Sequence, residues 1–596
     1  MDLAKQIEDI RIANRLEIRG RTYQEQIKDT LTELLADLFA HHTVAIKGGG
    51  THTAKLLELI RATGNLEKVY GIYDRKYTQI GEVKIGDAVF TGYPDSELVN
   101  CEADVVIAST FAHRREAARE IRQFNEDLTV FDLYDEMENK GIIINFLFYR
   151  AVEKGYESLL YYRSVYLANR DADSLWNYLV ACIMIDDFLS FREYVEIYIE
   201  NRWDGYESLQ TALQNFADLF EQVKDCLRKR KQKDMIMLWV DQLEYGQLQW
   251  CPFIQKQAEG SLFLENAYTF TPFTVATLYS IFLNLRSLDD KFYIDKPDVF
   301  SVDNSRFLSV VEKNGYDFTY IGDSIDAALF REEDRIGNYA YGPSTIRCVQ
   351  MLQKLMDSEK PAFILLHELV ETHTPYLGGS LDRARMIAWP YFLGVSDEER
   401  MEQMRKSALY WDRQWEWYSS FLNDEMSVIY MSDHGKRHDI TPIYKEKSTH
   451  VLVFAKGPGI PDKRIRKLFS LIDFYKLVEA LLGGHYEEEA FCSDHVQLQE
   501  SAIFNDTTIK FYLENHAENS AKAFRAVRTL TELFAKLSTG ERFYYLLPDE
   551  ETDHANDPAY AERIEELDAL AGDVFWNFDG YEERLKFFRS RMEGHE

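Results

Sequence analysis

The feature that most restricts the fold is a set of short apolar runs that end in polar residues. MIMLWV at 235–240 has no polar position, and its length is typical of a strand. A strand that is apolar on both faces belongs inside a parallel sheet covered by helices. Similar runs at 362–369, 426–433 and 449–461 are separated by helical patterns. The sequence therefore predicts an α/β fold with a large α/β/α domain.

A second alternating stretch lies nearer the N-terminus. VAIKGGGTHTAKLLELI reads as a strand, three glycines and a helix, and further strands are predicted at 68–74 and 103–109. The chain of 596 residues also exceeds the roughly 250 to 300 residues that one core supports. The predicted division is N-terminal helices at 1–42, a small Rossmann-like domain at 43–140, a helical connector at 141–232, the α/β/α domain at 233–505 and a helical C-terminal appendage at 506–596.

Charge and composition narrow the classes of partner. A net charge of −32 repels nucleic acids and anionic lipid surfaces. No apolar run reaches the 18 residues of a membrane span, and the start of the chain lacks the apolar core of a signal peptide. We therefore expect a cytoplasmic protein with a small-molecule or glycan substrate, no nucleic acid and no membrane span, and the sequence leaves a homo-oligomer open.

Metal-type ligands follow the apolar runs of the large domain. Asp241 comes directly after 235–240, Asp433 and His434 end the run at 426–433, and His450 lies in the last run. Open α/β sheets build their sites at the carboxyl ends of their strands. These residues are therefore candidate ligands of a divalent metal.

A threonine-rich segment supplies a candidate nucleophile. In NAYTFTPFTVATLYSIFLN, Thr274 falls in the first turn of a predicted helix, where backbone N–H groups attract an anion. A hydroxyl bound to a divalent ion is a nucleophile for phosphoryl or sulfuryl transfer. Thr271 and Thr277 compete with Thr274 for this role.

Together these segments resemble the sulfatase-like branch of the alkaline phosphatase superfamily, and within it the phosphoethanolamine and phosphoglycerol transferases. VDQ resembles the first metal-ligand motif, which implies Asp241 as a ligand, and TVAT resembles the nucleophile motif at Thr274. MSDHG resembles the motif of the next two ligands, Asp433 and His434. The resemblance implies one or two zinc or manganese ions and a phospho-threonine intermediate.

Two further histidines enter through the same resemblance. ETHTPY and STHVLVFAKGPGIP resemble histidine-bearing segments, which would make His373 and His450 substrate ligands, ligands of a second metal or proton donors. The CxPxR signature of sulfatases is absent, which favours chemistry at phosphorus. We expect a phosphotransferase or phosphodiester hydrolase acting on a carbohydrate- or alcohol-linked phosphate; the alternatives are a sulfate-ester hydrolase and a non-catalytic nucleotide-sensing scaffold.

The N-terminal glycines suggest a second ligand. Gly48, Gly50 and Thr53 lie in a turn that resembles a nucleotide or nucleotide-sugar fingerprint, and Asp74 ends the next strand, where a ribose-binding acid is expected. Thr53 stands where that fingerprint has glycine or alanine. The alternatives are a scaffold that binds no nucleotide and an NAD(P)-dependent oxidoreductase, for which no hydride-transfer partner stands out.

Overall fold

The computed structural model describes residues 2–110, 114–142, 155–286, 299–338, 342–373, 376–379, 396–435, 442–500 and 522–574. The chain forms two compact units. One consists of Met1–Asn14, Glu207–Ser380 and Gly394–Glu596, and the other of Arg15–Tyr206 and Leu381–Leu393. In the described residues, none of the helices combines the length and apolar composition needed to cross a bilayer.

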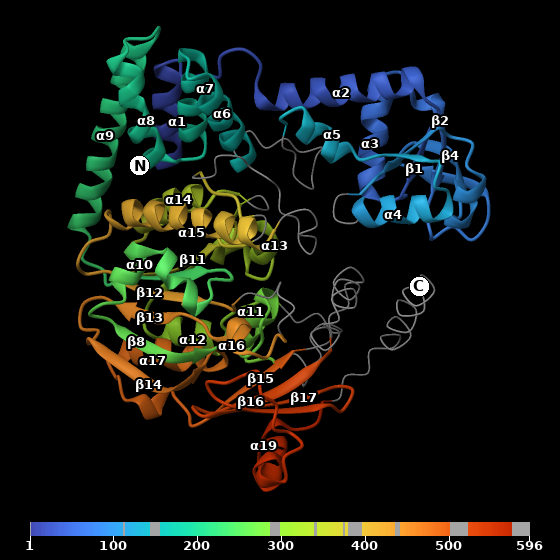
Figure 1. Cartoon of the computed structure of the whole chain (residues 1–596). Coiled ribbons are helices and arrows are strands. Elements are labelled where there is room, and N and C mark those ends of the chain that lie inside the picture. The colour runs from blue at the N-terminus through green and yellow to red at the C-terminus, as the bar shows by residue number, and fades with distance from the viewer. Residues whose placement is uncertain are drawn as a thin grey trace. The chain divides into compact units, whose positions relative to one another are not determined.

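The first unit is built on an eight-stranded sheet (Figure 1). Its order is β10-β9-β11-β7-β12-β13-β8-β14, and every strand except β13 runs in the same direction. The strands are β7 (Met235–Val240), β8 (Leu262–Tyr268), β9 (Asp317–Asp323), β10 (Arg335–Asn338), β11 (Ala362–Glu368), β12 (Ser427–Ser432), β13 (Val453–Lys456) and β14 (Lys463–Ser470). The predicted α/β/α fold class is confirmed by this sheet and its two helical layers.

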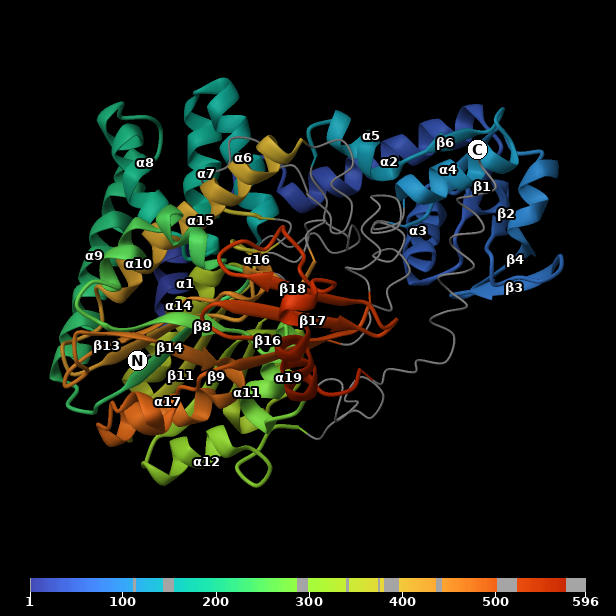
Figure 2. The same ribbon diagram turned by 60° about the horizontal axis from the view of Figure 1, so that its bottom comes forward.

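Both faces of the sheet are buried because its strands are apolar at nearly every position. Met237 and Trp239 of β7 pack into a core shared with α11, α12 and α17, and Leu238 is buried on the opposite face, where α14 and α15 lie (Figures 1 and 2). The helices of this unit are α1 (Leu3–Ala13), α9 (Tyr206–Lys229), α10 (Pro252–Gln257), α11 (Thr274–Leu283), α12 (Arg306–Lys313), α13 (Ser324–Ala327), α14 (Ser344–Asp357), α15 (Asp397–Ser419), α16 (Glu446–Thr449) and α17 (Phe474–Gly483).

A four-stranded antiparallel sheet completes this unit. Its strands are β15 (Val496–Glu500), β16 (Phe524–Arg528), β17 (Glu532–Leu537) and β18 (Arg542–Leu546), and α19 (Ala561–Ala571) packs on one face. The expectation of a helical appendage over 506–596 was therefore wrong for the strands at 524–546. The aromatic residues in Arg542–Leu546 favour a strand over a helix, and Phe524–Arg528 is buried at every position except Arg525, as a strand packed on both faces would be.

The second unit holds a six-stranded sheet of order β3-β4-β2-β1-β5-β6, parallel except for β3. Its strands are β1 (Val44–Lys47), β2 (Val69–Tyr73), β3 (Gly81–Ile85), β4 (Ala88–Tyr93), β5 (Val105–Ala108) and β6 (Thr129–Phe131). The helices of this unit are α2 (Tyr23–His41), α3 (Thr51–Ala62), α4 (Arg114–Phe124), α5 (Leu133–Asn139), α6 (Tyr156–Asn169), α7 (Ala172–Met184) and α8 (Phe188–Glu200). A capping box of Thr22 and Glu25 starts α2, and Asp171 caps α7.

Candidate metal centre

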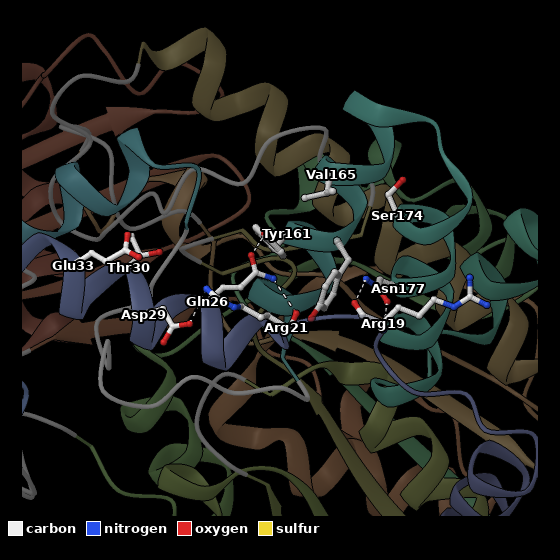
Figure 3. Close-up of a pocket in the computed structure, with 11 residues that line it drawn as sticks. Arg19, Arg21, Gln26, Asp29, Thr30, Glu33, Tyr161, Val165, Ser174 and Asn177 are labelled. Carbon is white, nitrogen blue, oxygen red and sulfur yellow. Dashed lines mark hydrogen bonds and ion pairs between the residues drawn. The ribbon is translucent and has the colours of Figure 1, made fainter. Parts of the chain in front are cut away.

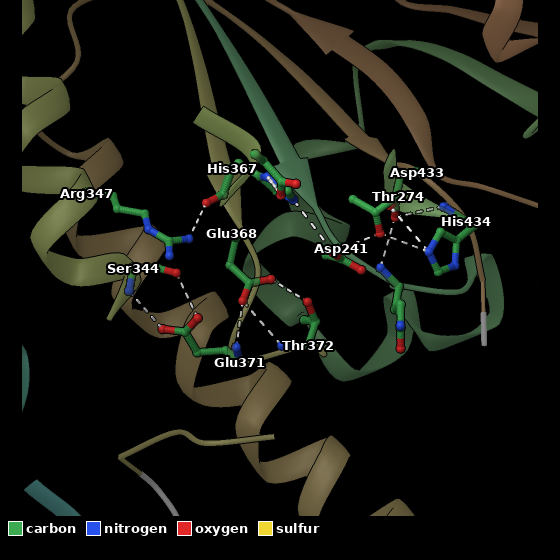
Figure 4. Close-up of polar contacts among 12 residues, drawn as sticks. Asp241, Thr274, Ser344, Arg347, His367, Glu368, Glu371, Thr372, Asp433 and His434 are labelled. Atoms are coloured by element: carbon green, nitrogen blue, oxygen red, sulfur yellow. Dashed lines mark hydrogen bonds and ion pairs between the residues drawn. The ribbon is translucent and has the colours of Figure 1, made fainter. Parts of the chain in front are cut away.

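Two neighbouring strands bring the predicted acidic ligands together. Val240 of β7 lies opposite Ser432 of β12, so Asp241 and Asp433 leave the same edge of the sheet as adjacent residues (Figure 4). His434 follows directly. One ligand atom from each of these three residues lies within 4.8 Å of the others, and all three side chains are buried. The structure thus brings three of the predicted metal ligands into one cluster.

Backbone donors fix the orientation of Asp433. Its Oδ1 accepts hydrogen bonds from the N–H of Gln242 at 3.0 Å and from its neighbour His434 at 2.8 Å. The backbone of Gln242 makes this hydrogen bond with φ at +56°, a left-handed conformation that costs free energy in a residue other than glycine. The second oxygen, Oδ2, has no hydrogen-bond partner among the described residues. One carboxylate oxygen is therefore held by the backbone and the other is left for a ligand.

The imidazole of His434 is oriented by its own loop. Its Nδ1 lies 2.7 Å from the carbonyl oxygen of Gly435, so the Nδ1–H donates there and the lone pair of Nε2 faces the cluster. Gly435 is needed because a Cβ at this position would lie 2.0 Å from the carbonyl oxygen of Lys447. The N–H of Gly435 donates to the carbonyl of Ser448 at 2.9 Å. The loop can approach α16 closely only with glycine here.

Thr274 is the threonine whose hydroxyl reaches the cluster. Its Oγ1 lies 3.2 Å from Nε2 of His434 and 3.3 Å from Oδ2 of Asp241 (Figure 4), and the residue is half-buried at the start of α11. The competing hydroxyls are engaged elsewhere: Thr271 donates to the buried Glu500 at 2.5 Å, and Thr277 donates to the carbonyl of Thr271 at 2.9 Å. The geometry therefore favours Thr274 over both neighbours.

The charge of the cluster calls for a cation. Burial, together with the negative charges of Asp433, Glu368 and Asp326, raises the pKa of Asp241 well above its usual value. Oδ1 of Asp241 and Oδ2 of Asp433 are both buried without a described hydrogen-bond partner. Unpaired buried carboxylate oxygens are costly unless they coordinate a metal. Two carboxylates, one imidazole and one hydroxyl form a donor set that suits zinc or manganese.

This cluster is the one group of at least three such ligands found in the described residues, and it could hold one ion. His373 is described and half-buried, five residues after β11. Burial and the charge of Arg347 lower the pKa of His367, and an electrostatic interaction with His373 adds to this, so His373 lies near the same edge of the sheet. Its predicted role in binding substrate stays a prediction.

His450 occupies a different environment from the one predicted. Its ring lies between Tyr245 and Tyr268, with centroids 4.1 and 4.9 Å away. Nδ1 pairs with the Glu446 carboxylate at 2.6 Å, and Nε2 lies 2.9 Å from the carbonyl oxygen of Glu265. Both ring nitrogens are thus occupied by protein groups. We therefore leave His450 out of the catalytic set proposed below.

Sequence reasoning missed the residues beside Asp241 on β11. The sequence motifs assign His367 no role, yet its Nε2 lies 3.6 Å from Oδ2 of Asp241. Glu368, the last residue of β11, is fully buried, and burial raises its pKa well above the usual value. It accepts hydrogen bonds from Glu371 and Thr372 (Figure 4). The sequence did contain a signal for this pair, because a histidine and an acidic residue end an otherwise apolar run.

The N-terminal glycine turn is closed by the protein's own groups. Gly48 has φ at +106°, and the N–H of Gly49 donates to Oδ2 of Asp74 at 2.6 Å. Thr53 is fully buried and donates to the carbonyl of Gly48 at 2.7 Å, while Gly50 begins α3 with no side-chain cap. Asp74, predicted to bind a ribose, is thus bound to the turn in this structure. The nucleotide ligand stays a prediction.

A hollow of about 390 Å³ lies in the second unit between α2, α6 and α7 (Figure 3). Its basic side chains are already paired, Arg19 with Asp173 at 2.8 Å and Arg21 with Asp29 at 2.9 Å. The cluster of Asp241, Asp433 and His434, found in the described residues, does not line this hollow. The chemistry predicted from the sequence therefore does not lie in this hollow.

Neither a protein-family model nor a curated protein matches the sequence. Solved structures similar to the chain include a 2-O GAG sulfatase (13% identity, 61% of this chain and 94% of that one, TM-score 0.45). They also include the phosphonate monoester hydrolases of Agrobacterium radiobacter (12%, 60% and 95%, TM-score 0.43) and Silicibacter pomeroyi (14%, 61% and 96%, TM-score 0.41).

Proposed function

We propose that the protein is a metal-dependent enzyme that transfers or hydrolyses a phosphate ester through a phospho-threonine intermediate on Thr274. The observation that carries this proposal is the position of the Thr274 hydroxyl, within 3.3 Å of both Oδ2 of Asp241 and Nε2 of His434. A hydroxyl beside buried metal-type ligands at the start of a helix combines a nucleophile with an anion-binding site. Asp433 completes the ligand set.

Asp241, Asp433 and His434 would hold a zinc or manganese ion, which supplies a Lewis acid for the transferred group and lowers the pKa of a bound hydroxyl. The Thr274 hydroxyl lies 3.3 Å from Oδ2 of Asp241, an acceptor for its proton, and 3.2 Å from Nε2 of His434, the nitrogen that would bind the ion. The uncapped N–H groups at the start of α11 are available to the oxygens of an anionic substrate. The chain's own groups thus orient both the nucleophile and the ester.

In the first step, the Thr274 hydroxyl gives its proton to Oδ2 of Asp241, Oγ1 forms a bond to phosphorus, the bond from phosphorus to the ester oxygen breaks, and the leaving alcohol takes up a proton. We assign the donor of this last proton to His373. In the second step, water or another alcohol attacks phosphorus and gives its proton back to His373, while the bond to Oγ1 breaks and Oγ1 recovers the proton held by Asp241. Water makes the enzyme a hydrolase and an alcohol makes it a transferase; a carbohydrate or small alcohol is the acceptor class we propose.

The test is the intact mass of the protein after incubation with nitrophenyl phosphodiesters and manganese or zinc. We expect an adduct on the wild type and on a Thr274→Ser variant, and none on Thr274→Ala. Thr277→Val, three residues along the same helix, is the matched control and should keep the adduct. A panel of sulfate esters tests the alternative reaction. An adduct that survives in Thr274→Ala, or no turnover of any ester by the metal-loaded wild type, would refute the proposal.

A further inference from the structure

The imidazole of His367 lies beside the candidate metal centre without belonging to it. β11 runs parallel to β7, with His367 opposite Trp239, and the N–H of Asp241 donates to the carbonyl of Glu368 at 3.1 Å. This pairing brings the His367 ring against the first residue after β7 (Figure 4). His367 has no exposed surface. A polar ring is therefore buried next to a proposed metal ligand.

Both ring nitrogens of His367 face polar groups. Nε2 lies 3.6 Å from Oδ2 of Asp241, and Nδ1 lies 3.6 Å from Oδ2 of Asp326. The hydroxyl of Tyr320 is closer to Nδ1, at 2.9 Å. Nε2 has no hydrogen-bond partner in the part of the chain that the structure describes, because 3.6 Å is longer than such a bond. The ring thus joins two buried acids, with one side bonded and the other side close to Asp241.

The contact with Tyr320 bears on the tautomer of the ring. The phenol hydroxyl lies 2.9 Å from Nδ1 and can donate its proton there. A neutral imidazole that accepts at Nδ1 carries its single N–H on Nε2. That N–H faces Oδ2 of Asp241. Donor and carboxylate therefore attract each other across the 3.6 Å gap.

The surroundings are built to keep this arrangement. Gly322, two residues after Tyr320 on the same strand, leaves the room that the phenol occupies: a Cβ at Gly322 would lie 2.3 Å from the Tyr320 hydroxyl. Arg347, fully buried in α14, donates to the carbonyl of His367 at 2.6 Å. Burying an imidazole costs more free energy than burying an apolar side chain of the same size. Three residues thus hold a costly ring in one place.

We propose that His367 is a positioning residue of the metal centre, whose Nε2–H attracts Oδ2 of Asp241 across 3.6 Å so that the carboxylate presents its other oxygen to the ion. This inference rests on the proposed function, because it takes Asp241 as a metal ligand. Groups behind a ligand commonly orient it and strengthen metal binding. His367 would act through Asp241 and would not touch the substrate.

The test is the affinity of the purified full-length chain for Mn²⁺, measured by calorimetric titration together with the melting temperature of the metal-free protein. His367→Phe fills the space but removes the N–H, and we expect its dissociation constant to rise about 10- to 100-fold. His367→Gln keeps an amide N–H near the position of Nε2 and should recover most of the affinity. Tyr320→Phe removes the hydroxyl that bonds Nδ1, so the ring can carry its N–H on either nitrogen. This variant should weaken Mn²⁺ binding less than His367→Phe does.

The outcomes separate this inference from the proposed function. If Asp241→Asn leaves Mn²⁺ binding unchanged, the metal centre itself is misplaced. If Asp241→Asn abolishes binding but His367→Phe binds as tightly as the wild type, only the positioning role is wrong. Equal losses in His367→Phe and His367→Gln would also overturn it, because the N–H would then not matter. Should His367→Phe fail to fold, the comparison of His367→Gln and Tyr320→Phe with the wild type still decides.

Discussion

We predict that Asp241→Asn makes the metal-free protein more stable while it removes the response to metal. Ligand atoms of Asp241 and Asp433 lie within 4.8 Å of each other, and neither residue is exposed. At an effective dielectric constant of ~20, two like charges at this distance repel by about 3 kcal/mol. Protonation already relieves part of this repulsion, so we expect the free energy of unfolding in EDTA to rise by 1 to 2 kcal/mol, an order-of-magnitude figure.

The assay is urea unfolding in EDTA and in Mn²⁺. A ligand at 100 times its dissociation constant stabilises the folded state by about 2.7 kcal/mol, and the wild type should gain a shift of this order. The Asp241→Asn variant should gain none, so the order of the two stabilities should reverse when metal is added. Asp462→Asn, at an exposed position, is the control and should follow the wild type. An Asp241→Asn variant that is no more stable in EDTA, yet gains the same stabilisation from Mn²⁺, would refute the reasoning.

Two further predictions concern glycine and histidine positions. Gly435→Ala would place a Cβ 2.0 Å from the Lys447 carbonyl oxygen, so we expect the free energy of unfolding to fall by roughly 1 to 3 kcal/mol and Mn²⁺ binding to weaken. Gly81→Ala is the control, because a Cβ at Gly81 would meet no atom within 4 Å. If the two variants behaved alike, the argument would be contradicted. Burial lowers the pKa of His52 from 6.5 to about 4, so the stability from its neutral ring is complete above pH 6.5 and is lost as the pH falls towards 4, by about 3 kcal/mol. Unfolding at pH 7 and 4 should show this loss in the wild type but not in His52→Gln, and equal losses would exclude the assignment.

The large sheet and its ligands could be predicted because the signal is local. The run that precedes Asp241 is apolar at every position, so the sequence predicts both the strand and the position of its carboxyl end. Parallel pairing with the strand before Asp433 then follows from the general placement of sites in open α/β sheets. Residues far apart in the sequence could be assigned to one site for this reason.

The other features of the site depend on contacts that no local pattern encodes. Thr271 competes with Thr274 in the sequence, and the structure separates them because Thr271 donates to Glu500 whereas Thr274 reaches Asp241 and His434. His450 and Asp74 have the spacing expected of functional residues, yet the fold uses them to bond Glu446 and the glycine turn. Such pairings depend on which loops meet, and one sequence does not contain that information.

The hydrogen bond from Thr271 to Glu500 has a consequence for how this protein can be divided. Glu500 ends β15, an edge strand of the small antiparallel sheet, and Gln499 on the same strand donates its N–H to the carbonyl of Phe270. The small sheet thus holds the segment before Thr274 in place through these two hydrogen bonds, although it contributes none of the proposed metal ligands. A shortened chain that ended before β15 would keep every reactive group but lose the support that aims the nucleophile.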